Sequence, residues 1–206
     1  MAEQILVGSH NAGKVRELAK LLDDLDVEWL GLDAIGLDLD VVESGESIES
    51  NAILKATSYA AAAGWLTLAD DSGLEVDALA GLPGVYSARY GDLKPPAQLQ
   101  LLLGQLADLG EAERAGRFRC VVALADAGGL LATAEGVCPG RIALTPAGEG
   151  GFGYDPVFFL PEFGRTMAEL SAAEKQRISH RGRAMRALAP RLRAALARAS
   201  AGRRPV

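Results

Sequence analysis

The chain has 206 residues, of which 49% are hydrophobic, and its 21 basic and 27 acidic side chains give a formal net charge of −6. A chain of this length can bury enough apolar surface to fold without disulfides or a structural metal, and two cysteines fit that expectation. The sequence begins with no cationic and apolar leader and has no apolar stretch long enough to span a membrane. We therefore expect no membrane association and a reduced, cytoplasmic location.

Basic side chains gather toward the end of the sequence. Residues 175–206 hold ten Lys or Arg and no acidic residue, which leaves 11 basic against 27 acidic residues in positions 1–174. A solvated, Arg-rich helix explains this pattern, and so does a small polyanion held beside acidic metal ligands. Because the rest of the surface would repel a phosphate backbone, we expect no nucleic acid partner.

The pattern of apolar residues predicts a single domain over residues 1–206, of the mixed α/β class. Apolar runs predict strands at 4–8, 27–30, 65–69 and 157–160, and a hairpin that pairs 118–126 with 130–137. Helical spacing predicts helices at 12–22, 48–64, 95–109, 172–178 and 181–199. The third strand is expected to end on Asp70, and Pro190 is expected to kink or restart the last helix.

The loop Gly-Ser-His-Asn-Ala-Gly-Lys at residues 8–14 lies between the first predicted strand and helix. Backbone N–H groups at a helix start and the Lys14 ammonium can together bind phosphate. A tight turn with Asn11 as the helix cap is the structural alternative. The loop fits the P-loop pattern except that Val15 stands where a Mg²⁺-binding Ser or Thr is required, which argues against a P-loop NTPase.

Asp70 and Asp71 follow an apolar run, at the end of a strand where ligands of α/β proteins gather. Carboxylates suit Mg²⁺, which takes one or two of them together with water and phosphate oxygens. An acidic turn before Gly73 is the alternative. Glu43 could supply a second carboxylate, whereas Glu46 and Glu49 belong with a helix cap at Ser47.

Two further segments carry side chains suited to a nucleotide. In Gly-Gly-Phe-Gly-Tyr-Asp-Pro at residues 150–156, glycines around Phe152 would let its ring stack on a flat ligand, or Phe152 could simply anchor the loop. In residues 174–182, Ser179 can cap a helix that begins at His180, so that His180 and Arg181 converge on an anion or a carbonyl oxygen. A solvated basic turn is the alternative there.

Taken together with residues 51–56 (Asn-Ala-Ile-Leu-Lys-Ala) and 82–90 (Leu-Pro-Gly-Val-Tyr-Ser-Ala-Arg-Tyr), these segments resemble the inosine triphosphate pyrophosphatase family over almost the whole chain. The resemblance implies a mixed α/β fold with a long central sheet flanked by helices. It also implies two lobes around a nucleotide cleft and a homodimer.

The same resemblance implies roles for individual residues. Asp71 matches the general base and a metal ligand, and Glu43 matches the second metal carboxylate. The residues matching the substrate site are Ser9, His10, Asn11, Ala12, Gly13, Lys14, Ser72, Phe152, Gly153, Tyr154, Asp155, Lys175, His180 and Arg181. His10 departs from the family pattern, which has a small residue there.

The implied activity is Mg²⁺-dependent hydrolysis of the purine nucleoside triphosphates ITP, dITP and XTP to a monophosphate and pyrophosphate. Donors at His180 and Arg181 would select a 6-keto purine, because an amino group at that position would leave buried donors unpaired. Two alternatives remain open from the sequence: a Maf-like nucleotide pyrophosphatase with another base preference, and a non-catalytic nucleotide-binding or RNA-binding module.

Overall fold

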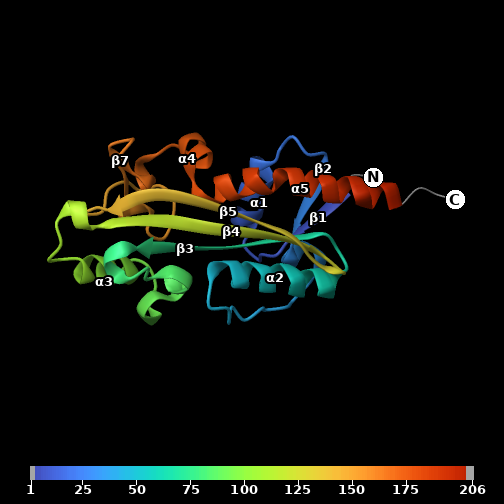
Figure 1. The fold of residues 1–206 in the computed structure, drawn as a ribbon, viewed down its shortest axis with the longest axis horizontal. Coiled ribbons are helices and arrows are strands. Elements are labelled where there is room, and N and C mark those ends of the chain that lie inside the picture. The colour runs from blue at the N-terminus through green and yellow to red at the C-terminus, as the bar shows by residue number, and fades with distance from the viewer. Residues whose placement is uncertain (1–2, 203–206) are drawn as a thin grey trace. The chain divides into compact units, whose positions relative to one another are not determined.

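The computed structural model describes residues 3–202, and its backbone forms two compact units. Unit 1 contains the chain up to Asp71, residues 121–136 and the chain from Gly182 onward. Unit 2 contains residues 72–120 and 137–181. Figure 1 labels the α-helices and all of the strands but β6 along the chain.

The strands belong to one seven-stranded sheet with the order β2-β1-β3-β4-β5-β6-β7. They are β1 (Glu3–Val7), β2 (Val27–Gly31), β3 (Thr67–Val76), β4 (Ala115–Asp126), β5 (Gly129–Ile142), β6 (Phe158–Leu160) and β7 (Arg165–Thr166). Strand β1 runs parallel to β2 and β3, whereas β6 runs antiparallel to β5 and β7. This mixed sheet confirms the predicted α/β class.

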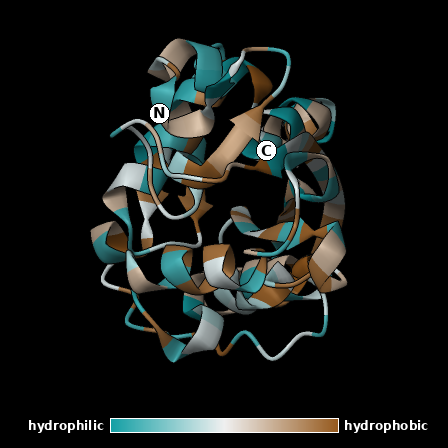
Figure 2. Ribbon diagram, turned by 90° about the vertical axis from the view of Figure 1, so that its left-hand side faces the viewer, coloured by the Kyte–Doolittle hydropathy of each residue, from teal (hydrophilic) through white to brown (hydrophobic). Residues whose placement is uncertain are grey.

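Five α-helices are present among the described residues, together with short 3₁₀ segments. The helices are α1 (Ala12–Leu21), α2 (Ile48–Ala63), α3 (Ala97–Gln105), α4 (Ala172–Ile178) and α5 (His180–Gly202). The 3₁₀ segments are η1 (Leu32–Ile35), η2 (Asp77–Leu79), η3 (Gly84–Asp92), η4 (Glu111–Glu113), η5 (Asp155–Val157) and η6 (Met167–Glu169). Figure 2 shows that the helical ribbons carry both hydrophobic and hydrophilic stretches, as expected for helices that cover a core.

In unit 1, helices pack on both faces of the strands. Helix α1 supplies the partner of Asp70 and helix α2 that of Asp71, and neighbouring residues of a strand point to opposite faces. Helix α5 lies on the α1 side, where Arg193 pairs with Asp24 just after α1. Met185, Leu188 and Leu192 of α5 are fully buried, which confirms the predicted apolar stripe over those positions.

Capping residues bound helices α1 and α2 close to their predicted positions. Asn11 caps α1, and Ser47 with Ser50 forms a capping box at the start of α2. Gly64 ends α2 in the left-handed conformation, with φ of 71°, which glycine adopts without a steric penalty.

The core of unit 2 is built from β6, helix α3 and the adjoining ends of the long strands. Leu74, Leu102, Leu106, Ile142 and Phe158 are completely buried there. The buried Arg114 guanidinium donates to the backbone carbonyls of Leu106 and Leu109 just after α3, at 2.7 and 3.1 Å. Both carbonyls lie beyond Gln105, the last residue of α3, and the predicted helix at 95–109 is too long at both ends.

One further prediction of secondary structure is wrong, a restart of the helix at Pro190 is not found, and the sequence predicts no strand at the position of β7. Strand β3 does not end at Asp70 but continues to Val76, because lysines compensate its buried carboxylates and Gly73 lets η3 approach closely. A Cβ atom on Gly73 would lie 2.2 Å from the Gly84 carbonyl oxygen. Helix α5 continues through Pro190 without a restart, since apolar packing on both sides holds it. Strand β7 has two residues, too few to show a periodic pattern.

Between residues 3 and 202, no helix is both long and apolar enough to cross a membrane. The single-domain organisation, the nucleotide cleft, the homodimer and the cytoplasmic location stay predictions.

Candidate functional site

The loop before α1 is a capped strand-to-helix turn. The side-chain oxygen of Asn11 accepts from the amides of Gly13 and Lys14, at 2.8 and 3.3 Å. The Ser9 hydroxyl oxygen accepts from the Asn11 amide at 3.1 Å. Three of the predicted phosphate donors are therefore engaged within the loop, and the Lys14 side chain is a charged donor that the loop presents.

Lys14 lies against a buried acid. Its ammonium is 2.8 Å from Asp70 Oδ1, and the Asp70 side chain is almost completely buried while that of Lys14 is one-quarter exposed. This ion pair compensates the Asp70 charge and holds the lysine at the start of α1. The sequence alone indicates no partner for Asp70.

Asp71 faces helix α2 instead. Lys55 Nζ donates to Asp71 Oδ1 at 3.0 Å and to Glu43 Oε1 at 2.6 Å, so one ammonium joins the two carboxylates predicted to bind metal. Asn51, one turn earlier on α2, has its amide nitrogen 3.5 Å from Asp71 Oδ2. The side-chain oxygen of Asn51 accepts from the Gly45 amide at 2.7 Å, beside Glu43 in sequence.

Burial and charge shift the proton affinities of this cluster. Burial raises the pKa of Asp71 and is the largest effect on it. The charge and hydrogen bond of Lys55 lower this pKa, Glu43 and Asp70 add smaller upward contributions, and the net shift is upward. Burial alone would lower the pKa of Lys55, but attraction to Asp71, Asp70 and Glu43 raises it above its ordinary value. Lys55 is therefore charged at neutral pH, and Asp71 is a better proton acceptor than an exposed aspartate.

The residues present fit a Mg²⁺ site with only two protein ligands. No group of three or more His, Cys, Asp and Glu converges as a ligand set within the part of the chain that the structure describes. Glu43 and Asp71 nevertheless direct two carboxylate oxygens at one point that already holds a cation, the Lys55 ammonium. Magnesium usually takes one or two carboxylates and completes its shell with water and phosphate.

In unit 2, Asp155 organises the glycine-rich loop. Asp155 Oδ2 accepts from the Phe152 amide at 2.8 Å and from Lys175 Nζ at 2.5 Å. The same ammonium lies 4.8 Å from the centre of the Phe152 ring. Phe152 is 63% exposed, so its ring is held in place while leaving most of its surface open to a flat ligand.

Tyr154 has a different environment from Phe152. Its side chain is buried, and its hydroxyl donates to the Ser87 carbonyl at 3.0 Å. Burial raises the pKa of Tyr154, so the phenol stays neutral. Gly153 has a positive φ of 59° and separates the exposed ring from the buried one. The contacts of Tyr154 in this structure are those of a core residue.

His180 and Arg181 begin helix α5 and are both buried in unit 2. The His180 ring stacks on Phe118 with 4.9 Å between centroids and an angle of 18°. Arg181 Nη2 lies 3.5 Å from the Ser72 hydroxyl, which brings together two residues predicted for the substrate site. Ser179 has extended backbone angles, as a residue that precedes a helix should.

The predicted site residues thus form two groups. Unit 1 holds the loop at 9–14 with Glu43 and Asp71, and unit 2 holds Ser72 with the residues from Phe152 to Arg181. Asn51 and Lys55 are partners of Asp71 that the sequence motifs did not indicate, although both lie in the family motif at residues 51–56. Their spacing of four residues, which places both on one face of α2, was the available signal.

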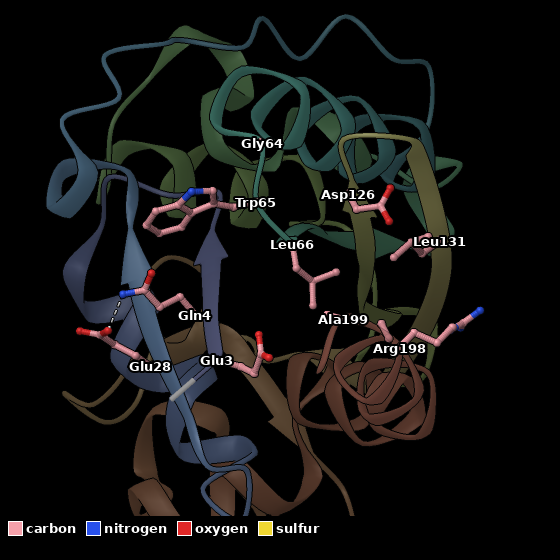
Figure 3. A pocket seen from close by; sticks show the side chains of 11 residues that line it. Glu3, Gln4, Glu28, Gly64, Trp65, Leu66, Asp126, Leu131, Arg198 and Ala199 are labelled. Carbon is pink, nitrogen blue, oxygen red and sulfur yellow. Dashed lines mark hydrogen bonds between the residues drawn. The ribbon is translucent and has the colours of Figure 1, made fainter. Parts of the chain in front are cut away.

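A cavity of about 920 Å³ in unit 1 lies apart from these residues. It is lined by side chains that include Glu3, Glu28, Trp65, Asp126 and Arg198, and Figure 3 shows Gln4 bonded to Glu28 at its edge. None of the predicted catalytic, metal or substrate residues lines it. Cavity size alone therefore does not identify the candidate site.

Comparison with known proteins decides the family. The model of the Ham1 family matches residues 5–191. The chain belongs to the Ham1 family. Its fold is similar to that of the Staphylococcus aureus Ham1 protein, whose structure is solved. The TM-score is 0.84, and the two sequences are 38% identical over 93% of this chain and 99% of that one.

Other Ham1 relatives match across nearly the full length. The dITP/XTP pyrophosphatase of a Nostoc species is 46% identical over 95% of this chain and 97% of its own length. The protein of the same name from Shigella flexneri is 45% identical over 93% of this chain and 98% of its own. These matches confirm the resemblance indicated by the sequence motifs.

Proposed function

We propose that this Ham1-family chain is a nucleoside triphosphate pyrophosphatase that hydrolyses noncanonical purine nucleotides, namely dITP, ITP and XTP, to a monophosphate and pyrophosphate. The observation that carries the proposal is the buried carboxylate of Asp71, whose pKa is raised. Lys55 joins this carboxylate to that of Glu43, and the adjacent residue of the same strand, Asp70, pairs with Lys14. Relatives named dITP/XTP pyrophosphatase, which match over nearly the full length of the chain, support it.

The charged group proposed to bind the triphosphate is Lys14. Its ammonium is partly exposed at the start of α1, where the helix dipole also favours an anion. Because Asp70 holds the ammonium in place, little side-chain entropy would be lost when phosphate binds.

Glu43 and Asp71 would hold Mg²⁺, which when bound would offset the charge that develops on the leaving pyrophosphate. The Asp71 carboxylate also serves as the general base. It accepts a proton from water, the water oxygen forms a bond to the α-phosphorus, and the bond from that phosphorus to the α,β-bridging oxygen breaks. The electron pair of the broken bond leaves with pyrophosphate.

Base recognition is assigned to the residues of unit 2. Arg181 is a donor with no acceptor, which favours a 6-keto oxygen over an amino group. The exposed ring of Phe152, oriented by Lys175 and Asp155, offers a stacking surface for the purine. Together these groups would favour hypoxanthine and xanthine over adenine.

A panel of triphosphates tests the proposal. The purified chain is incubated with dITP, ITP, XTP, GTP, ATP and pyrimidine triphosphates, with and without Mg²⁺, and both pyrophosphate and orthophosphate are measured. We expect pyrophosphate from dITP, ITP and XTP and only in the presence of Mg²⁺. Preference for another base would favour a Maf-like specificity, and binding without turnover would favour a non-catalytic module. Direct release of orthophosphate would contradict the proposed bond cleavage.

A further inference from the structure

We infer that Lys55 is a resident counter-cation that occupies the place of the metal between Glu43 and Asp71, so that metal binding displaces its ammonium. The inference rests on the proposed metal site and adds a residue with a defined role in it. The Lys55 ammonium bonds to both of these carboxylates.

The burial of the cluster makes a counter-cation necessary. The Lys55 side chain is only 10% exposed and that of Asp71 only 12%, so neither charge is well solvated. Two close carboxylates without a cation would repel each other in this poorly hydrated environment. The ammonium therefore keeps the site assembled in the absence of a metal.

Helix α2 holds the site together at two points. Asn51 and Lys55 lie one turn apart, and each contacts both Asp71 and the irregular segment that contains Glu43 and Gly45. A Cβ atom on Gly45 would lie 2.6 Å from the Asn51 side-chain oxygen, so the segment approaches α2 as closely as glycine permits. Glu43 is thus positioned by α2, although it lies outside any helix or strand.

The two cations cannot share this point. The ammonium nitrogen is 2.6 and 3.0 Å from the two carboxylate oxygens, which is hydrogen-bonding distance. A divalent metal bound to the same oxygens would repel the ammonium at this short range. A flexible lysine side chain can move aside, whereas both carboxylates are needed by the metal. Displacement would leave the Lys55 ammonium available to another anion.

Two substitutions with opposite expected effects test the inference. Metal affinity is measured by titration calorimetry with Mg²⁺ and with Mn²⁺, in the absence of nucleotide, and the melting temperature is followed with and without metal. Lys55→Met removes the competitor, so we expect binding at least about fivefold tighter, a lower melting temperature without metal and a larger rise on adding it. Lys55→Arg adds a less easily displaced fork of donors, so we expect weaker metal binding.

Lys14→Met is the matched control. It removes one positive charge from a buried aspartate of the same strand but leaves Glu43 and Asp71 with their partner. If Lys14→Met changes the metal affinity as much as Lys55→Met does, the effect comes from the loss of any nearby positive charge, and the inference is overturned. Unchanged affinity in both Lys55 variants would overturn it too.

Lys55→Met leaves two buried carboxylates without their ammonium, so its folding is tested with and without metal. If this variant folds only when Mg²⁺ or Mn²⁺ is added, the metal replaces the ammonium as inferred. If it does not fold under either condition, Lys55→Arg decides, since unchanged or tighter metal binding by that variant contradicts the inference. Pyrophosphate release by the unaltered chain is measured separately, so failure of the proposed function would be recognised independently.

Discussion

Asp70 and Asp71 are neighbours on strand β3, yet each is paired with a lysine from a different helix. Asp70 binds Lys14 of α1 at 2.8 Å, and Asp71 binds Lys55 of α2 at 3.0 Å. The alternation of side chains along a strand produces this division, because consecutive residues point to opposite faces. Two identical residues are thus assigned to different environments and, in our proposal, to different tasks.

The first prediction compares the two aspartates. Asp71→Asn keeps the shape of the side chain but removes the proton acceptor, so turnover should fall by at least about a hundredfold. Asp70→Asn is the matched control, because the same chemical change is made on the opposite face of β3. Steady-state pyrophosphate release measures both, and circular dichroism checks the fold. A smaller loss in Asp71→Asn than in Asp70→Asn would move the base to Asp70.

The second prediction concerns selection of the purine. Arg181→Ala should lower kcat/KM for ITP more than for ATP, because only ITP loses a charge-assisted hydrogen bond, worth roughly 1.5–3 kcal/mol. The preference for ITP should shrink by about ten- to a hundredfold. If Arg181 binds phosphate instead, both substrates lose the same factor. Ser72→Ala is a useful comparison, since Arg181 keeps its charge there but loses its nearby hydroxyl.

The third prediction is a pH dependence at the loop proposed to bind phosphate. A hydrogen bond from His10 Nδ1 to Asp33, 2.6 Å long, raises the pKa of His10 above its ordinary value of 6.5, with Asp38 and the Leu39 carbonyl adding to the effect. The imidazolium charge is present below this raised pKa and is lost as the pH rises through it. The KM for a triphosphate should therefore increase over that interval.

Substitutions of His10 and Asp33 distinguish the charge of the imidazolium from the hydrogen bond that raises its pKa. His10→Gln should remove the pH-dependent increase in KM, and Asp33→Asn should move it to lower pH because the raising hydrogen bond is weakened. The stability contribution of the pair has the same sign: it is present below the ordinary pKa of histidine and lost as the pH rises through the raised one. A KM profile unchanged in His10→Gln would exclude this histidine from phosphate binding.

The fourth prediction concerns the acid stability of α4, the helix that contains Lys175. Bonds from the backbone and hydroxyl of Ser171, and one from Arg165, lower the pKa of Glu174 from 4.5 to about 2. A lowered pKa means that the stabilisation is present above 4.5 and is lost as the pH falls toward 2. Glu174→Gln should therefore be less stable than the unaltered chain at neutral pH and should match it near pH 2.

Urea unfolding at several pH values between 2 and 7 measures the difference in Glu174→Gln. Glu162→Gln, which alters an exposed carboxylate in the same unit, is the control. A stability difference that persists at pH 2 would show that the ionised carboxylate is not its source.

The elements with strong local signals could be predicted from the sequence. Helix α1 begins after its cap Asn11, and α2 ends at Gly64 with a positive φ, so both lie within a residue of their expected bounds. Strand β3 could not be predicted beyond Asp70, because two adjacent aspartates disfavour a strand in isolation. Only their pairing with Lys14 and Lys55, distant in sequence, makes the extended strand favourable.

The candidate site shows the same division. Motif order indicated Asp71 and Glu43, but Lys55 lies inside a helix, where a lysine usually indicates a solvated face. Its burial follows from the fold and not from its neighbours in the sequence. Phe152 and Tyr154 likewise stand two residues apart in one glycine-rich loop, yet one is 63% exposed and the other is 5% exposed. Composition does not distinguish those two rings.

The alternation of side chains along β3 also restricts where residues can be inserted or deleted. One residue inserted or deleted in β3 ahead of Asp70, with the pairing of the preceding residues kept, would exchange the faces of every residue that follows. Asp71 would then point toward α1 and lose Lys55. The segment around Glu43 lies in neither helix nor strand, so its side chains do not alternate between two faces. Natural or engineered length changes should therefore be excluded from β3 and be found, if anywhere near the site, before Glu43.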